Sequence, residues 1–398
     1  MTSFAQSVTL DDLERDPYAV YARLRAEAPV AFVPAVNSWL VSRWNDVNTV
    51  TNSPKLFSAE DDNAPVVRHF GKPAIIHTDG EEHQTLRGGI APYYMPRKVA
   101  SYIEPLVRPL AQARIRAFEN RGHAELICEY FEPVSALSLA HTFGLTDISS
   151  ETLMEWFHGL SMGAINFERD PERTAICDKT IADIDAALDP ALSRVEAQPD
   201  DTPLSTMMRH NMPDGQVRAR DYIMPSIRVA LLGGMQEPGH GAATTLVGLL
   251  QNPDQMAMLQ GDPDTLLPKS VLEGVRWIAP IGTQGRTPFE DTELGGVILP
   301  KGQTVSALIA SANRDASKFA NPDQFDITRS ETAQAAFGFG QHFCAGKWFS
   351  LAQMELLLRI LFEELDNIAF TDGSPPEFQG WEFRAPRDFN VTFSARAA

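Results

Sequence analysis

Cysteine is scarce in this 398-residue chain. Only Cys128, Cys177 and Cys344 occur, spaced 49 and 167 positions apart. No CxxC pair or zinc-type spacing is present, and three cysteines make no disulfide framework. Free cysteine usually behaves as a small buried hydrophobe, and the amphipathic contexts of Cys128 and Cys177 fit that role. The glycine-rich, aromatic context of Cys344 does not, so Cys344 is the candidate for chemistry.

Basic residues are also few. The chain has 34 Lys and Arg against 52 Asp and Glu, a net charge of −18. Such a surface repels phosphate backbones and anionic lipids, so we expect neither nucleic acid nor membranes as partners. The N-terminus lacks a basic stretch followed by an apolar run, and no stretch approaches 18 uninterrupted apolar residues. We therefore expect a cytoplasmic protein.

Hydrophobic residues make up 43% of the chain, which is enough for a large core. Apolar spacing and capping signals predict helices over 16–28, 84–119, 123–143, 151–163, 174–196, 217–251 and 345–367. Alternation and glycine turns predict β structure in 29–43, 286–312 and a last hairpin in 383–393, and a loop is predicted over 197–203. The prediction is one mainly α domain over 1–398 with a small β portion.

One predicted helix contains the stretch "LLGGMQEPGHGAATTLVG" (231–248), in which four glycines and a proline fall within nine positions. In a regular helix these residues would together cost roughly 7 kcal/mol relative to alanine. That is comparable to the net stability of many whole domains, about 5–15 kcal/mol. The stretch is therefore either a loop or a helix broken for a purpose.

The segment "AAFGFGQHFCAGKWFSLAQ" places Cys344 just before an amphipathic helix, where backbone N–H groups and the helix dipole favour a thiolate. Phe337, Gly340, His342, Cys344 and Gly346 match the pattern FGxGxHxCxG. In this the chain resembles the cytochrome P-450 family. The resemblance implies that haem b (iron protoporphyrin IX) lies between a long distal helix and this proximal loop, with the Cys344 thiolate as axial ligand of the iron.

Other family patterns lie elsewhere in the chain. The pair Glu273 and Arg276 in "VLEGVRW" matches the ExxR brace of the haem-binding core, with Arg329 as its third member. The resemblance also implies that four cationic side chains clamp the haem propionates: His83, Arg87, Arg286 and His342.

By the same resemblance, the broken stretch crosses the oxygen-binding face of the haem. Gly233 and Gly234 allow close approach, and Pro238 cannot donate to the carbonyl of Gly234. The family's acid–threonine pair is replaced by Gln236 and Glu237. Thr244 lies only 29 residues before Glu273, whereas Glu237 lies 36 before, nearer the family's separation. We therefore expect Glu237, with Gln236, to relay protons; the alternative is that Glu237 only bonds a neighbouring helix.

Longer stretches, including "GMQEPGHG", "FGKPAII" and "GHAELICEYFEPVSALSLA", resemble bacterial guaiacol-type aromatic O-demethylases of lignin catabolism. By register, the substrate pocket is expected to contain Phe70, Ile76, Ala164, Val229, Gly233, Ile281 and Phe383. Phe70 and Phe383 would sandwich a flat ring. Ala164, where relatives carry a bulky aromatic, would leave room for an alkyl or second methoxy group.

The resemblance implies O-demethylation of a methoxyphenol (guaiacol, 4-alkylguaiacol or syringol type) to a catechol and formaldehyde with O2. No flavin or iron–sulfur motif is present, so electrons from NAD(P)H would arrive through a separate reductase carrying FAD and an iron–sulfur centre. That partner would dock on the proximal face, near Lys347. Three alternatives remain: a hydroxylase of a terpenoid or polyketide, a peroxide-driven variant, and a non-catalytic haem sensor.

Overall fold

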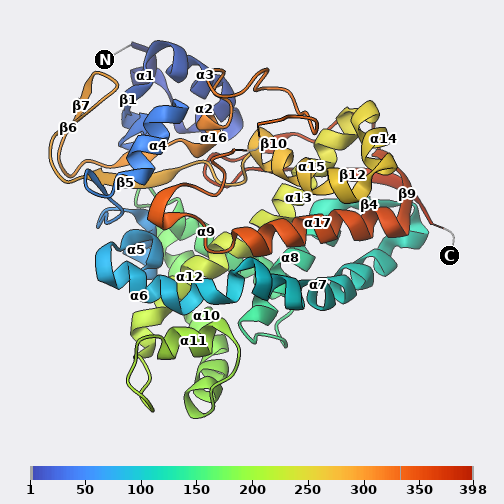
Figure 1. Cartoon of the computed structure of the whole chain (residues 1–398), viewed down its shortest axis with the longest axis horizontal. Coiled ribbons are helices and arrows are strands. Elements are labelled where there is room, and N and C mark those ends of the chain that lie inside the picture. Colours follow the sequence, from blue (N-terminus) through green and yellow to red (C-terminus); the bar gives the residue numbers. More distant parts are fainter. Residues whose placement is uncertain (1–2, 332, 397–398) are drawn as a thin grey trace.

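The computed structural model describes residues 3–331 and 333–396. Helices form most of the molecule; β1, β5, β6 and β7 lie towards the end that holds the N-terminus, whereas β4, β9 and β12 lie on the side of the C-terminus (Figure 1). The chain starts with α1 (Ser3–Ser7), α2 (Leu10–Arg15) and α3 (Pro17–Glu27). Asp16 caps α3 by accepting from the N–H of Ala19, and Pro17 is its first residue, as the sequence predicts.

A five-stranded sheet lies next to these helices, in the order β1-β2-β8-β5-β3. The predicted hairpin is confirmed, because β1 (Val30–Val33) pairs antiparallel with β2 (Ser38–Val41). The strand β8 (Val305–Ala307) runs parallel to β2 and antiparallel to β5 (Gln284–Pro288). The remaining β elements of this part are β3 (Phe57–Ser58) and the small hairpin of β6 (Thr292–Leu294) and β7 (Val297–Leu299).

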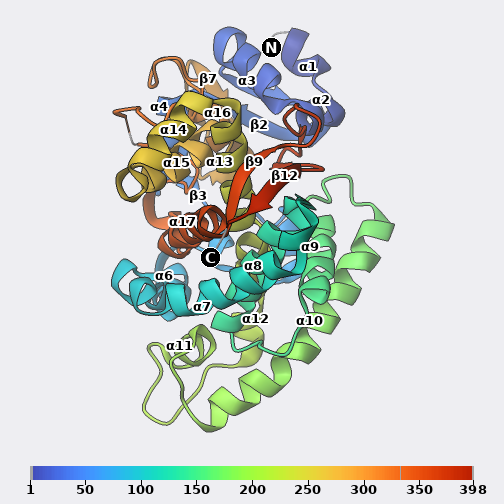
Figure 2. The ribbon, with the colours of Figure 1, turned by 90° about the vertical axis from the view of Figure 1, so that its right-hand side faces the viewer.

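The helical body surrounds two consecutive helices, α12 (Arg220–Met235) and α13 (Glu237–Gln251). Helix α13 is buried over almost its whole length and packs between α15 (Pro263–Trp277) and α17 (Lys347–Glu364). Figure 2 shows α8, α9, α10 and α12 side by side in the lower half of the molecule. The other helices are α4 (Trp44–Asn52), α5 (Pro65–Phe70), α6 (Gly80–Ile90), α7 (Pro96–Phe118), α8 (Glu132–Thr142), α9 (Ser150–Ala164), α10 (Pro171–Ala197), α11 (Pro203–Arg209), α14 (Pro253–Gly261) and α16 (Ile309–Ala312).

Two predicted helices are shorter than expected. The range 84–119 divides into α6, a 3-10 turn over 91–94 and α7, because Pro92 and Pro96 lack the N–H that a continuous helix needs. The range 123–143 begins instead as the strand β4 (His123–Glu125), after Gly122 has turned the chain with a φ of 72°. A π-helical turn, Ile127–Phe131, then leads into α8.

The prediction that the tail forms a hairpin over 383–393 is wrong, because its strands pair with other segments of the chain. The last helix ends at Glu364, and the chain continues directly as β9 (Leu365–Phe370). The tail forms no hairpin of its own over 383–393. Instead β12 (Asn390–Ala395) pairs with β9 and β4, and β11 (Ala385–Pro386) pairs with β10 (Phe378–Gln379). The tail strands therefore belong to different sheets from 29–43 and 286–312.

Among the described residues, no helix is both long enough and apolar enough to cross a membrane.

Candidate active site

Cys344 lies in a tight loop just before α17. Gly338 and Gly340 both have a φ of +68°, which side-chain-bearing residues rarely adopt. A Cβ on Gly340 would come within 2.8 Å of the backbone oxygen of Thr51. The N–H of Cys344 donates to the carbonyl of Phe337 at 2.9 Å, which closes the loop and directs its residues to a large internal cavity.

Burial and the N–H groups at the start of α17 act on the pKa of the Cys344 thiol in opposite directions. Burial raises the pKa of the Cys344 thiol, and this outweighs the lowering by the N–H groups of Gly346 and Lys347 and by Arg87. A metal ion that coordinates a thiol deprotonates it, so a bound haem iron would favour the thiolate of Cys344. The N–H groups that act on the thiol are those of Gly346 and Lys347.

Cationic and imidazole side chains converge at one side of the same cavity. His83 and Arg87, one turn apart on α6, line it together with His342 of the cysteine loop. The ring centres of His83 and His342 are 4.1 Å apart, and Asp79 holds His342 through a 3.1 Å contact to Nε2. Arg87 donates to the carbonyl of Phe343 at 2.5 Å, which ties α6 to the cysteine loop.

Two of the four side chains expected to bind the haem propionates, His83 and Arg286, have a nitrogen without a hydrogen-bond partner among the described residues. Nε2 of His83 and Nη2 of Arg286 are buried without a hydrogen-bond partner among the described residues. Burial lowers the pKa of Arg286 to about 10 and that of His83 to about 4. Arg286 lies in β5 next to the cavity wall and does not itself line the cavity. Unpaired buried donors of this kind indicate an anionic ligand, because burying them without one is costly.

The predicted brace is assembled as three side chains. Arg276 donates from Nε and Nη2 to the two carboxylate oxygens of Glu273, both at 2.7 Å. Its Nη1 and Nη2 also donate to the carbonyls of Asn313, Pro322 and Gln324. Arg329 reaches Glu273 at 3.3 Å. The trio thus joins α15 to the segment that leads into the cysteine loop.

The glycine- and proline-rich stretch is a helix broken at one residue. Helix α12 ends at Met235, α13 begins at Glu237, and Pro238 lies in the first turn of α13. A Cβ on Gly233 would meet no atom within 4 Å, since it would project into the cavity, whereas a Cβ on Gly239 would come within 2.6 Å of the oxygen of Phe131. Gly233, just before the break, therefore leaves space in the cavity, whereas Gly239, just after it, lets α13 pack closely against the backbone of Phe131.

Glu237 lines the cavity beside Pro238, and neither of its carboxylate oxygens has a hydrogen-bond partner among the described residues. Burial raises its pKa to about 8, and Glu132 adds to the rise. Gln236 differs from expectation, because its amide donates to Sδ of Met154 at 3.3 Å and the residue does not line the cavity. Thr244 is fully buried further along α13, away from the cavity lining.

The cavity has a volume of about 850 Å³, within the usual range for ligand sites. Of the residues predicted to contact substrate, six line it: Ile76, Ala164, Val229, Gly233, Ile281 and Phe383. Phe70 does not, because its ring is fully buried in the main core at the end of α5. The predicted aromatic sandwich is therefore absent, and Phe383 instead stacks edge-on against Phe157, with ring centres 5.7 Å apart.

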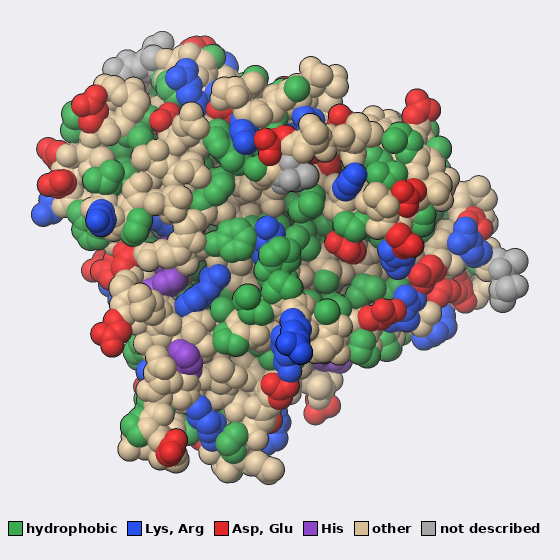
Figure 3. All heavy atoms as spheres, in the orientation of Figure 1, with side chains coloured by type: hydrophobic (Ala, Val, Ile, Leu, Met, Phe, Trp, Pro, Cys, Tyr) green, Lys and Arg blue, Asp and Glu red, His purple; other side chains and the backbone are tan. Residues whose placement is uncertain are grey.

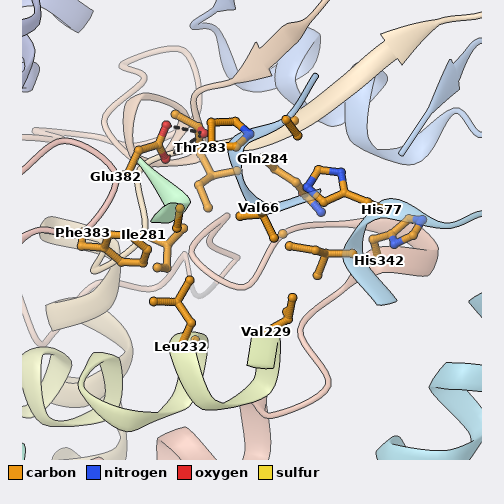
Figure 4. A pocket seen from close by; sticks show the side chains of 18 of the residues that line it. Val66, His77, Val229, Leu232, Ile281, Thr283, Gln284, His342, Glu382 and Phe383 are labelled. Atoms are coloured by element: carbon orange, nitrogen blue, oxygen red, sulfur yellow. Dashed lines mark hydrogen bonds between the residues drawn. The ribbon is translucent and has the colours of Figure 1, made fainter. Parts of the chain in front are cut away.

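Figure 4 shows aliphatic side chains facing Phe383 across the cavity, among them Val66, Val229 and Leu232. Sequence reasoning missed Val66 and Leu232, and it missed two polar sets. One is the buried pair of His240 and Glu132, 2.7 Å apart next to Glu237. The other is Glu382 with Thr283 at the cavity wall. No motif marks these residues; only the fold brings them together.

The residues present fit a haem. A cysteine thiol, the unsatisfied nitrogen of His83 and the side chain of Arg87 line one cavity bounded by α6, the cysteine loop and the α12–α13 break, and the unsatisfied donor of Arg286 lies next to its wall. Cys344 would hold the iron, and the donors would take the two propionates. This combination defines a haem-thiolate protein.

Comparison with known proteins agrees with this class. The family model for cytochrome P450 matches residues 244–387. The linalool 8-monooxygenase of Pseudomonas putida is 31% identical over 88% of each chain. The 6-deoxyerythronolide B hydroxylase of Saccharopolyspora erythraea is 27% identical over 89% of this chain and 91% of its own. The structure of cytochrome P450 CYP109Q5 from Chondromyces apiculatus superimposes with a TM-score of 0.84 at 24% identity, over 98% of each chain.

The chain belongs to the cytochrome P450 family. It is accordingly a haem-thiolate monooxygenase that uses O2 and depends on an electron donor.

Proposed function

We propose that this monooxygenase removes the O-methyl group of a methoxyphenol. The proposal rests on the stretch 231–248, in which Glu237 takes the position of the family's threonine beside the helix break, as in the guaiacol-type O-demethylases that the sequence resembles. The cavity beside it has one aromatic wall at Phe383 and aliphatic walls opposite, which suits a small, flat, mostly apolar substrate.

The bound haem supplies the chemistry that activates O2. The net change is insertion of one oxygen atom into a methyl C–H bond of Ar–O–CH3, while the second oxygen atom leaves as water with two protons and two electrons. The resulting hemiacetal then collapses to a phenol and formaldehyde. The aliphatic cavity walls keep water away from the reacting methyl group, and Ala164 leaves room for a further ring substituent.

In this proposal Glu237 delivers the protons. Its carboxyl is unpartnered at the cavity wall, so it is free to exchange a proton there, and a raised pKa suits a donor near neutral pH. The alternative role, a bond to a neighbouring helix, lacks a partner among the described residues. Replacing Glu237 with Ala should increase peroxide release per NADH and decrease formaldehyde. Unchanged coupling would rule the relay out.

The electron donor is proposed to dock next to the cysteine loop. The Nζ of Lys347 lies 4.8 Å from the ring centre of Trp348, which is 41% exposed, and 5.0 Å from that of Phe343. The face towards the viewer in Figure 3 carries hydrophobic side chains with basic ones among them. A separate reductase with flavin and an iron–sulfur centre would fit such a face. Turnover with NADH and reductase, and none with peroxide alone, is expected.

Hydroxylation of a terpenoid or macrolide is the second candidate, and the named relatives favour it more directly than they favour O-demethylation. The aliphatic walls of the cavity would accept a terpenoid equally well. The deciding experiment is a titration of the ferric protein with guaiacol, 4-alkylguaiacols, syringol and linalool, following the low- to high-spin shift of the Soret band. A shift with a methoxyphenol, followed by formaldehyde on turnover, supports the first candidate. A shift with linalool alone supports the second.

A further inference from the structure

A carboxyl–hydroxyl pair faces the cavity on the side opposite the imidazoles of His77 and His342 (Figure 4). Oγ1 of Thr283 lies 3.0 and 2.9 Å from the two carboxylate oxygens of Glu382. Two backbone contacts fix the pair: the N–H of Gly282 donates to the carbonyl of Glu382 at 3.1 Å, and Ile281 pairs with Phe383 in an isolated bridge. Gly282 permits this approach, since a Cβ there would come within 2.2 Å of the oxygen of Trp381.

The carboxyl of Glu382 has bonding capacity to spare. Thr283 donates to it from its hydroxyl, which carries one proton, and from its backbone N–H, while an ionised carboxylate can accept about four hydrogen bonds. None of the ion pairs between described residues includes Glu382. The charge that acts on it is the like charge of Glu14 in α2, and burial raises its pKa to about 7. A carboxylate held this way at a mostly apolar cavity keeps acceptor sites that a ligand hydroxyl can fill.

This pair stands apart from the reacting end of the cavity. The segment that carries Glu382 packs against α2, where the N–H of Gly380 and Nη1 of Arg384 donate to the carbonyl of Glu14 at 2.9 and 3.5 Å. Cys344 belongs to a loop that the bond from Arg87 to the carbonyl of Phe343 ties to α6. We therefore place the pair at the end of the cavity beside the N-terminal helices, and Cys344 at the end beside α6.

We infer that Glu382 and Thr283 form a hydroxyl-binding subsite, which accepts a hydrogen bond from a hydroxyl group on the part of the substrate away from the haem. The inference deepens the proposed function and rests on it in taking this cavity as the substrate site. The subsite selects a hydroxylated substrate over a hydrocarbon of the same shape, because beside the hydrocarbon the carboxyl keeps acceptor sites unfilled and shielded from water. It also fixes which end of the substrate reaches the iron.

The test uses two ligands that differ by one group of equal size: 4-(3-hydroxypropyl)-2-methoxyphenol and 4-butyl-2-methoxyphenol. Their dissociation constants are measured from the Soret spin-state shift of the ferric, haem-loaded protein. The variants are Glu382→Leu, Thr283→Val and, as a control on an exposed carboxylate, Glu290→Gln. The native protein and the control should bind the hydroxypropyl ligand about tenfold more tightly than the butyl ligand.

In Glu382→Leu the preference should vanish, with the butyl ligand bound at least as tightly as before. In Thr283→Val the preference for the hydroxypropyl ligand should be weaker than in the native protein and stronger than in Glu382→Leu. Unchanged affinity for the butyl ligand also shows that the variant is folded. A native protein without preference for the hydroxyl, or a Glu382→Leu variant that weakens both ligands equally, would overturn the subsite, because a purely structural role predicts equal weakening.

A second pair separates this inference from the proposed function: linalool and the hydrocarbon in which a methyl group replaces its hydroxyl. If neither methoxyphenol shifts the Soret band but linalool does, and its advantage over the hydrocarbon disappears in Glu382→Leu, the methoxyphenol assignment fails and the subsite stands. If neither pair binds, or if both pairs bind without preference for the hydroxyl, the subsite is wrong.

Discussion

The carboxyl of Glu237 lies in surroundings unlike those that carboxylates usually occupy. It is buried at the cavity wall with no hydrogen-bond partner among the described residues, and burial raises its pKa to about 8. A raised pKa in the folded state means that folding favours the protonated form. Well below the ordinary pKa of glutamate, the group is protonated in both states. As the pH rises towards 8, the unfolded state ionises first, and stability falls.

Replacing Glu237 with Gln should remove this pH dependence, because glutamine does not ionise. Relative to the native protein, the variant should gain stability progressively between about pH 5 and pH 8. The gain should approach about 1.4 kcal/mol for every tenfold difference between the ionisation constants of the folded and unfolded states. Urea unfolding of the haem-loaded proteins at pH 5 to 9 measures this difference, with Glu290→Gln as control. Parallel stability curves would contradict the assignment.

At the scale of elements, the break between α12 and α13 combines two kinds of glycine. Gly239→Ala should destabilise the protein by about 1–3 kcal/mol, because the added Cβ meets the backbone of Phe131, which cannot move aside as a flexible side chain would. Gly233→Ala should leave stability unchanged or increase it by up to about 1 kcal/mol, since its Cβ enters open space.

The two variants should therefore separate stability from binding. Gly233→Ala should weaken the binding of the bulkier ligands in the Soret titration, while Gly239→Ala should change unfolding more than affinity. Equal destabilisation by both substitutions would contradict this, because it would show that Gly233 is needed for packing as Gly239 is.

The junction between α15 and the segment before the cysteine loop depends on Arg276. Lysine cannot reproduce the planar fork that meets Glu273 and three backbone carbonyls. Arg276→Lys should destabilise the fold by about 3–5 kcal/mol, since it leaves a buried carboxylate poorly paired. Arg329→Lys loses one contact of 3.3 Å to Glu273, so it should lower the free energy of unfolding by less than Arg276→Lys does. Chemical unfolding of both variants measures the difference, and equal losses would contradict it.

At the scale of the whole molecule, the cavity of about 850 Å³ separates the cysteine loop and α6 from the α12–α13 break. Haem binds only the folded chain, so its removal should lower Tm. Amide exchange should rise most in Gly80–Ile90 and 337–346, which face the cavity and contribute groups expected to hold the haem, and least in α13. Uniform exchange across the chain after haem removal would show that the ligand does not act locally.

Much of this site could be predicted from the sequence because its parts are local. The cysteine loop needs glycines at fixed offsets from Cys344, the brace needs Glu273 and Arg276 one turn apart, and Pro238 must break a helix wherever that helix lies. The fold class follows from long apolar periodicities. The match to the cytochrome P450 family agrees with the predicted fold class and with the predicted haem-thiolate site.

Other features depended on distant parts of the chain. Phe70 was expected at the substrate and lies in the core, because the position of an aromatic ring depends on the direction in which α5 packs. The last strand, β12, pairs with β9 and β4, whose registered partners lie between 21 and 269 residues away, and no local pattern specifies such partners. Gln236 was expected at the cavity, but it donates to Met154, which lies 82 residues away in the sequence and which only the fold brings close.

The sequence by itself determined which residues are expected to bind haem and the point at which the distal helix breaks, because turn geometry, helix breaking and i, i+3 contacts act over a few residues. Only the tertiary structure decided the electrostatic state of those residues. Burial is a property of the whole fold, and it raises the pKa of Cys344, Glu237 and Glu382 and leaves Arg286 and His83 with unsatisfied donors. The pairing of Glu382 with Thr283 likewise joins two turns that are 99 residues apart.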